Sequence, residues 1–284
     1  MAKAKKAKRD IRQEVTDKIV EALESGTAPW VKPWTGNALD GAPHNLSGHV
    51  YRGINVLLLT LAQMNRGYAT SQWMTYNQAK KEGGQVRKGE KSTTVVLYKI
   101  IPLKDEDGED TGLTIPIMRH FAVFNRDQVD GLPPVEVVEV PEVERHESAE
   151  EVIANTGAKI SHGGDRAFYS PSADAVRLPN PESFDNIEEY YATAFHELGH
   201  WTGHKSRLDR PIRNVHGSKE YALEELIAEL TSAFLCVENN VEGRLQHPEY
   251  IAGWIKVLKD DKRAIFTASS KARKAADFVA GVAN

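Results

Sequence analysis

The chain has 284 residues, of which 40% are hydrophobic and 27% charged, as in a folded globular protein. It has no apolar run of roughly 18 residues and only one cysteine, Cys236, so we expect no membrane span, no internal disulfide and a cytoplasmic location. Residues 1–100 carry 16 Lys and Arg against 8 Asp and Glu, whereas residues 131–284 carry 17 against 25. This split indicates two roles, and the basic half is the candidate for binding a polyanion.

The first part of the chain combines helical and strand patterns. Apolar residues recur every four positions over 11–26, which predicts a helix that ends near a glycine. Two further helices are predicted over 55–67 and 70–84. Segments 85–102 and 115–127 are rich in β-branched residues and flank an acidic loop, which predicts a β-hairpin.

Residues 131–148 combine prolines, glutamates and short valine pairs, a composition typical of an extended linker. We therefore expect a domain over 1–130 and a second over 149–284. The second domain is predicted to be mainly helical, with a short β-hairpin within 166–179 and Cys236 as a small core residue. The predicted fold class is α+β. The helices expected in this part of the chain span 147–157, 185–203, 218–240 and two segments within 247–282.

Two histidines, His196 and His200, stand one helical turn apart, and Glu197 directly follows the first. On a helical wheel the apolar residues of 185–203 gather on one side and the two histidines face the other. Imidazoles spaced in this way can bind one cation at about 2.0–2.1 Å. Glu197 lies to the side, where it can take a proton from water without binding the ion. The pattern therefore predicts the HExxH site of a zinc hydrolase, with Glu197 as general base.

A catalytic zinc site needs a third protein ligand. His204 lies eight residues after His196, about 12 Å along a continuous helix, which is too far to share one ion unless the helix breaks. The segment 218–240 offers carboxylates instead. Glu229 lies at the flank of its apolar stripe and is the expected third ligand, with Glu225 as the alternative. One divalent ion is predicted, Zn²⁺ first, and Mn²⁺ or Fe²⁺ would also suit two histidines and a glutamate.

Aromatic rings alternate with basic and amide side chains between residues 30 and 99. Flat rings stack on unpaired bases and cations follow phosphates, so this mixture favours binding of single-stranded DNA without sequence preference. No helix-turn-helix, zinc-finger or RNA-recognition signature indicates readout of a duplex. The residues expected to contact DNA are Tyr51, Arg52, Arg87, Lys88 and Lys91.

The chain contains, in this order, the segments HNLSGHVYRGIN, WMTYNQAKKEGGQVRKGEKST, FAVFNRDQ, AFHELGHWTGH and YALEELIAEL. Taken together, these segments resemble those of the ArdC antirestriction proteins of conjugative plasmids, and of the N-terminal part of related plasmid primases. The resemblance covers nearly the whole chain. It implies a domain that binds single-stranded DNA joined to a zincin-like metalloprotease domain, and a role in protecting incoming plasmid DNA from host restriction. It also supports His196, His200 and Glu229 as metal-binding residues.

The hypothesis from the sequence is thus an antirestriction protein that binds single-stranded DNA and carries a metal-dependent peptidase-like site. A host protein would be the substrate of that site. The alternative is a pure DNA-binding protector whose metal site is structural or regulatory.

Overall fold

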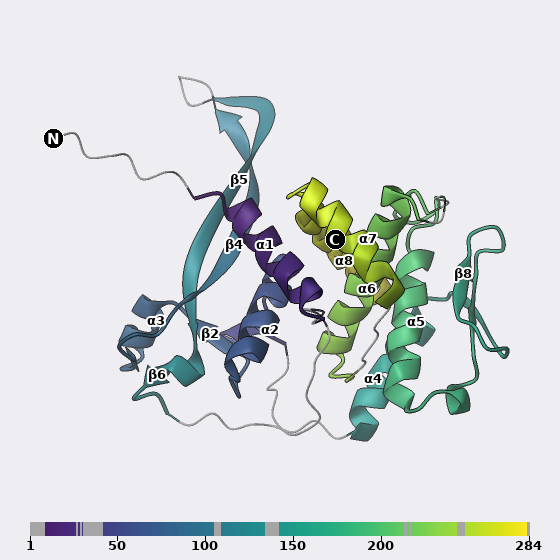
Figure 1. Cartoon of the computed structure of the whole chain (residues 1–284), viewed down its shortest axis with the longest axis horizontal. Helices are drawn as coiled ribbons and strands as arrows, with labels where there is room; N and C mark the ends of the chain where they lie inside the picture. Colours follow the sequence, from purple (N-terminus) through teal and green to yellow (C-terminus); the bar gives the residue numbers. More distant parts are fainter. Residues whose placement is uncertain are drawn as a thin grey trace. The chain divides into compact units, whose positions relative to one another are not determined.

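The structure is a computed structural model and shows mixed helix and strand content, as the predicted α+β class requires (Figure 1). No helix among the described residues is long and apolar enough to cross a lipid bilayer. The residues that the structure describes are 9–26, 28, 30, 42–104, 109–133, 142–212, 215, 217–242 and 248–282.

Contacts divide the chain into two compact units. Unit 1 comprises Met1–Asn37, Arg52–Leu57 and Val138–Asn284, and unit 2 comprises Ala38–Tyr51 and Leu58–Val137. This division differs from the domains expected from the sequence, which place all of residues 1–130 together. The reason is visible in the first helix, α1 (Ile11–Glu24), which packs against a helix near the C-terminus. Its buried Thr16 hydroxyl donates to the carbonyl of Lys262 at 3.0 Å.

Unit 2 contains a four-stranded sheet of order β1-β2-β5-β4. The helix α2 (Ile54–Arg66) enters this unit at Leu58. Strands β4 and β5 form the predicted hairpin, paired from Thr93 opposite Val123 to Lys104 opposite Asp110. The strands are β1 (His44–Asn45), β2 (Gln72–Met74), β3 (Gln85–Val86), β4 (Thr93–Lys104), β5 (Asp110–Asn125) and β6 (Val129–Asp130), with the short helices α3 (Tyr76–Lys81) and η1 (Arg126–Gln128) between them.

The prediction of a helix over 70–84 is wrong for the first half of that segment. Trp73 and Met74 lie in strand β2, are fully buried and pair with the end of β5. Thr75 then caps α3, and its hydroxyl and backbone exchange hydrogen bonds with Gln78 in a capping box. Burial of two large side chains in the sheet outweighs the helical pattern of the segment.

Unit 1 is mainly helical, and a small sheet of order β7-β9-β8 lies beside its helices. Strands β8 and β9 form the predicted hairpin, and β7 adds to it in parallel. Helix α4 begins at Glu142, so the last part of the expected linker is helical, while 134–141 lie outside the described residues. The elements are α4 (Glu142–Asn155), β7 (Lys159–His162), β8 (Phe168–Ser170), β9 (Ala175–Leu178), η2 (Pro181–Ser183), α5 (Ile187–Trp201), α6 (Lys219–Glu238), α7 (Pro248–Asp260) and α8 (Ala264–Val279).

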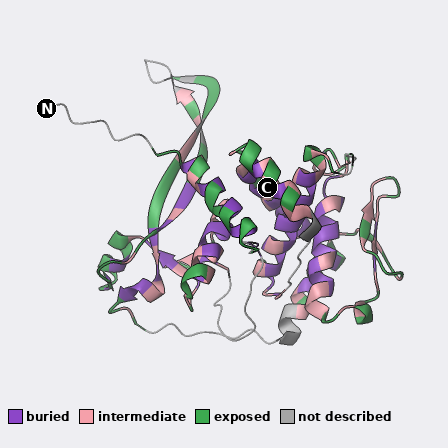
Figure 2. Ribbon diagram, in the orientation of Figure 1, coloured by how far each residue is buried: buried purple, intermediate pink, exposed green. Residues whose placement is uncertain are grey.

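Helices α5 and α6 form the centre of unit 1, and both are buried along most of their length (Figure 2). They approach closely at Gly199, where a Cβ would lie 3.1 Å from the Cα of Ala228. A glycine at this point of HELGH therefore lets the two backbones come together. Cys236 of α6 is buried, as predicted.

Candidate metal centre

The HExxH segment lies on the second half of α5. Asn186 caps the start of this helix by accepting a hydrogen bond from the backbone of Glu189, and the helix ends at Trp201. His204 lies past that end, and its ring nitrogen Nδ1 contacts the hydroxyl of Ser206 at 2.8 Å. The structure thus leaves two histidines, His196 and His200, on one continuous helix, with their ring centroids 4.9 Å apart.

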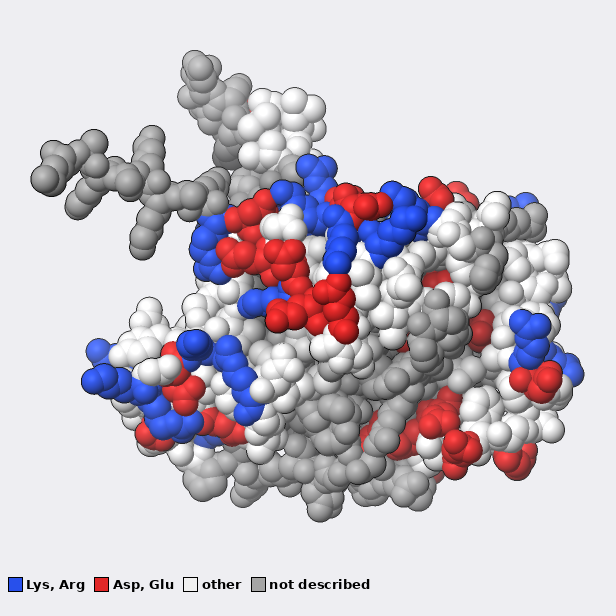
Figure 3. Space-filling model, viewed as in Figure 1, with Lys and Arg blue, Asp and Glu red and all other residues white. Residues whose placement is uncertain are grey.

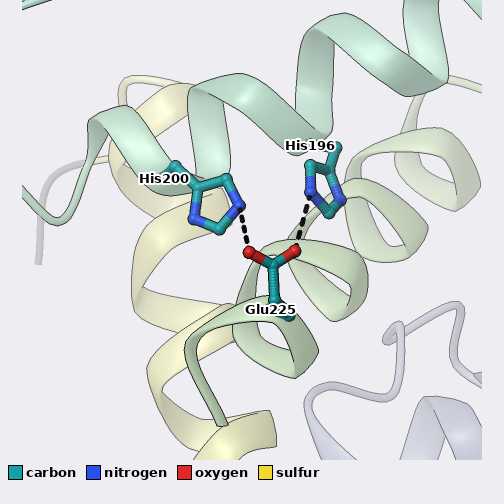
Figure 4. Close-up of side chains that lie close together, drawn as sticks. All are labelled: His196, His200 and Glu225. Atoms are coloured by element: carbon teal, nitrogen blue, oxygen red, sulfur yellow. Dashed lines mark ion pairs between the residues drawn. The ribbon is translucent and has the colours of Figure 1, made fainter. Parts of the chain in front are cut away.

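A carboxylate of α6 lies between these two rings (Figure 4). The Nε2 atom of His196 is 3.6 Å from Oε2 of Glu225, and Nε2 of His200 is 3.6 Å from Oε1 of the same side chain. One ligand atom from each residue can be chosen so that all three lie within 4.8 Å of one another. Atoms bound to a tetrahedral ion at about 2.0–2.1 Å lie about 3.3 Å apart, so only small adjustments would bring the three onto one cation.

The other ring nitrogens also face carboxylates of α6. The Nδ1 atom of His196 is 3.3 Å from Oε2 of Glu229, and Nδ1 of His200 is 3.3 Å from Oε1 of Glu224. An imidazole that donates its second N–H to a carboxylate is held in one tautomer with its Nε2 free for a metal. Glu229 is therefore placed to orient His196 without binding the metal itself, and Glu224 is placed to orient His200 in the same way.

A buried arginine holds Glu224 in place. Arg210 donates from Nε to Oε2 of Glu224 at 3.0 Å and from Nη2 to Oε1 at 2.7 Å. The same guanidinium donates to the hydroxyl of Thr202 at 2.8 Å and to the carbonyl of Gly199 at 2.7 Å. Arg210 thus ties the end of α5 to α6 and balances the charge of Glu224.

The cluster is electrostatically coupled. Burial lowers the pKa of both imidazoles, but hydrogen bonds with the glutamates more than offset it, raising the pKa of His196 to about 9 and of His200 to about 10. Burial would raise the pKa of Glu224 and Glu225, yet hydrogen bonds to the histidines hold both below the usual range of a glutamate. Two protonated imidazoles carry the same charge as one divalent cation, so such an ion could replace the two protons.

These residues fit a divalent cation by donor type as well as by spacing. Two neutral imidazoles and one carboxylate are ligands that zinc and manganese both accept, and three protein ligands leave a position open for water or substrate. Glu197 is buried beside His196, and its negative charge contributes to the raised pKa of that ring. The arrangement can therefore support hydrolysis assisted by a Lewis acid.

The structure brings together the sequence-predicted His196, His200 and Glu197, and it distinguishes the two carboxylates that the sequence left open. Glu225, the alternative in the sequence, lies on the Nε2 side of both rings, whereas Glu229 faces the Nδ1 side of His196. Glu224 and Arg210 were missed. The sequence indicates a role for Glu224 only through its position next to Glu225 on a helix that the structure shows to be buried, and it gives no such indication for Arg210.

The residues expected to contact DNA occupy several environments. Arg52 forms an ion pair with Asp277, and Arg87 contacts Glu90 at 3.0 Å and Asp130 at 3.3 Å. Tyr51 packs against a core cluster that includes Trp73, and burial raises the pKa of its hydroxyl. Lys88 and Lys91 are exposed. Lys and Arg gather over the α3 and β6 region of Figure 3, with acidic side chains among them.

Both halves of the chain match known protein families. A family model described as the N-terminal domain of anti-restriction factor ArdC matches residues 9–124, and one described as a zincin-like metallopeptidase matches residues 147–271. Two Escherichia coli proteins named DNA primase TraC are 43% and 41% identical over 96% of this chain. The chain spans only 27% and 20% of the length of those primases.

Other relatives match from end to end. The uncharacterized protein y4eC of Sinorhizobium fredii (strain NBRC 101917 / NGR234) is 42% identical over 95% of this chain and 91% of its own length. The metal-free crystal structure of antirestriction protein ArdC from plasmid R388 has a TM-score of 0.79 at 42% identity, covering 95% of this chain and 97% of that chain. The Mn(II)-bound structure of the same protein has a TM-score of 0.78 at 40% identity, with 96% and 98% covered. This chain therefore belongs to the ArdC family of antirestriction proteins.

Proposed function

We propose that this protein protects incoming plasmid DNA from restriction by binding it as a single strand, and that its helical unit is a metal-dependent peptidase. The observation that carries the peptidase part is the facing of His196, His200 and Glu225 across α5 and α6. Two relatives named DNA primases contain a segment like this chain, which supports a role on DNA.

The proposed metal ligands are His196, His200 and Glu225. Glu229, the ligand expected from the sequence, is better placed to orient His196, because it faces the ring nitrogen remote from Glu225. The ion is one divalent cation. Zinc suits the two histidines and the glutamate, and the relative from plasmid R388 has been crystallised with Mn(II).

When bound, a divalent cation supplies Lewis-acid chemistry, acidifying water and polarising a carbonyl oxygen. Glu197 directly follows a proposed ligand on α5 and is buried, so it is placed to accept a proton from the attacking water and to return it to the leaving amine. Glu224 and Glu229 keep the two imidazoles in the orientation that ligation needs. The proposed substrate is a polypeptide of the host.

Replacement of Glu197 by Gln tests whether the peptidase contributes to protection. The variant keeps both histidines and the glutamates Glu224, Glu225 and Glu229, so metal and DNA binding should stay at the wild-type level. Cleavage of a denatured protein substrate should fall by about 100-fold or more, because one proton acceptor is lost. Transfer of an unmodified plasmid into a restricting host should fall in parallel.

Transfer that persists at the wild-type level with the Glu197→Gln protein would contradict peptidase action as the means of protection. It would leave DNA binding as the activity and give the metal a structural part. The DNA part is tested separately, by electrophoretic mobility shifts with a single-stranded oligonucleotide at low salt. Failure to form a complex would remove that part of the proposal.

A further inference from the structure

One face of the β4–β5 hairpin extends past the core of unit 2, and no described residue of that unit covers it. Residues directly opposite each other in an antiparallel pair lie on the same face of the sheet. The register places Phe121 opposite Val95, Arg119 opposite Leu97 and Ile117 opposite Lys99. Leu97, Lys99, Ile115, Arg119 and Phe121 therefore share one face, which we call the arm face.

The core ends where the arm face begins. Val95 and Val123, on the same face, are buried with Leu59 of α2 and Trp73, whereas Phe121, directly opposite Val95, is exposed, as are Leu97 and Ile115 beyond it. Phe121 is 44% exposed, Leu97 39% and Ile115 38%. Figure 2 shows the described part of the hairpin mostly green toward its far end. Exposed apolar side chains that share one face, rather than lying scattered, are a feature of interaction surfaces.

The two cations of the arm face differ from Arg87, another exposed cation of unit 2. Lys99 and Arg119 are exposed, and no acidic partner for either is found in the part of the chain that the structure describes. Arg87, by contrast, contacts two carboxylates and the carbonyl of Asp127. The charges of the arm face are thus available to an anionic ligand.

A flat ring beside aliphatic side chains and unpaired cations is the combination that binds single-stranded nucleic acid. Unpaired bases stack on the ring, and the cations follow the phosphates. A duplex hides the faces of its bases, so it would leave Phe121 and Leu97 unused. A second copy of this chain, packed through the same face, would bring Lys99 and Arg119 of both copies together, at a cost in charge repulsion.

We infer that the arm face binds single-stranded nucleic acid, with Phe121 as the stacking platform and Arg119 and Lys99 as phosphate contacts. The inference rests on the proposed DNA-binding function and gives it a location. By sequence, residues 105–109, which follow β4, are acidic apart from one glycine, so phosphate contacts are expected to stop before this segment.

The test compares two double variants of the full-length protein that carry the same two substitutions at the same spacing. Arg119→Ala with Phe121→Ala removes the centre of the arm face, and Arg166→Ala with Phe168→Ala removes an exposed pair from unit 1. The measurement is the fluorescence anisotropy of a labelled oligodeoxythymidylate over a range of salt concentrations. The arm variant should bind about ten-fold or more weakly, and the unit 1 variant should match the wild type.

Single variants separate stacking from phosphate contact. Arg119→Ala should reduce the magnitude of the salt slope of log Kd by about 0.7, the value for one phosphate of a single strand. Phe121→Ala should weaken binding with the slope unchanged. Lys99→Ala, at an exposed position, provides a second test that does not depend on how well the Phe121 variant folds, and it should lower the slope as Arg119→Ala does.

Each outcome decides a different claim. If the wild-type protein fails to bind the oligonucleotide, the proposed DNA-binding function fails. If the wild type binds and the arm variants bind as tightly, or if the unit 1 variant loses as much affinity, the location on the arm face is wrong. Arm variants that change the molar mass in light scattering while leaving DNA binding intact would show a protein interface there, and would also overturn the inference.

Discussion

The α5–α6 cluster and the arm face place their polar groups in opposite environments. Glu224, Glu225 and Glu229 are at least nine-tenths buried, and each has a histidine within 3.3–3.6 Å. On the arm face the charges are exposed and the apolar side chains are uncovered. A metal site needs fixed ligands, because an ion tolerates little variation in distance. A surface that binds any single strand needs adaptable side chains instead.

The largest effect is expected where the buried charges depend on one another. Arg210→Met leaves Glu224 without its bidentate partner, and breaking one side of a buried ion pair costs about 3–5 kcal/mol of the free energy of unfolding. Chemical denaturation measures the loss. The matched control is Lys219→Ala, which removes an exposed pair with Asp260 and should cost less than about 1 kcal/mol. Equal losses in the two variants would refute the buried network.

The close approach of the two helices gives the next effect. Gly199→Ala places a methyl group 3.1 Å from the Cα of Ala228, which should destabilise the protein by about 1–3 kcal/mol. Gly253→Ala on α7 is the control, because its added Cβ meets only the Cβ of Ala222 at 3.5 Å. That change should be neutral or stabilise the helix by up to about 1 kcal/mol. Changes of opposite sign in the free energy of unfolding of the two variants would show that the close contact between the helices, and not the helix propensity of alanine, sets the effect at Gly199.

A smaller effect follows from Asp174, whose carboxylate pairs with Arg207. The hydrogen bond from this guanidinium lowers the pKa of Asp174 to about 2. A carboxylate with a depressed pKa stabilises the fold above its unfolded pKa of about 3.9, and this contribution disappears as the pH falls through about 2. Asp174→Asn should therefore lower the melting temperature slightly at pH 7, with the difference vanishing between about pH 4 and pH 2. A difference that stays constant over this range would rule out the ion pair as its cause.

The smallest effect on stability is expected from a substitution at an exposed position of the β4–β5 hairpin. Leu113 is 63% exposed, so Leu113→Ser should change the free energy of unfolding by no more than about 0.5 kcal/mol. Val95→Ala, in the buried base of the same hairpin, should cost more, because it removes apolar contacts from the core. Similar costs at the two positions would mean that the hairpin is packed along its whole length.

That His196 and His200 share one face of a helix could be predicted because the evidence is local: spacing and periodicity fix which residues share a helical face. For the third ligand the sequence favoured Glu229 over Glu225 from their places on a helical wheel. The wheel assumes one apolar stripe facing one core, but α6 contacts α5, α7 and α8, and is buried on several sides. Glu224 and Glu229 are tolerated there because histidines and Arg210 balance their charge.

The DNA-contact residues were harder to predict for a related reason. Arg52 pairs with Asp277, 225 residues away in the sequence, and no local pattern reveals such a partner. The hairpin itself was predicted from its β-branched residues. Which of its side chains are buried depends on what packs against them, as Leu59 of α2 does against Val95 and Val123, and that is a property of tertiary packing.

Metal binding by variants of α6 tests the central claim most directly. Isothermal titration of the metal-depleted protein with Zn²⁺ and with Mn²⁺ should give one equivalent for the wild type, for Glu229→Ala and for the control Glu238→Ala. Glu229→Ala should bind about 10–100-fold more weakly, as expected for a carboxylate that only orients a ligand, and Glu225→Ala should lose the site. Full affinity in Glu225→Ala together with loss of the ion in Glu229→Ala would contradict the account.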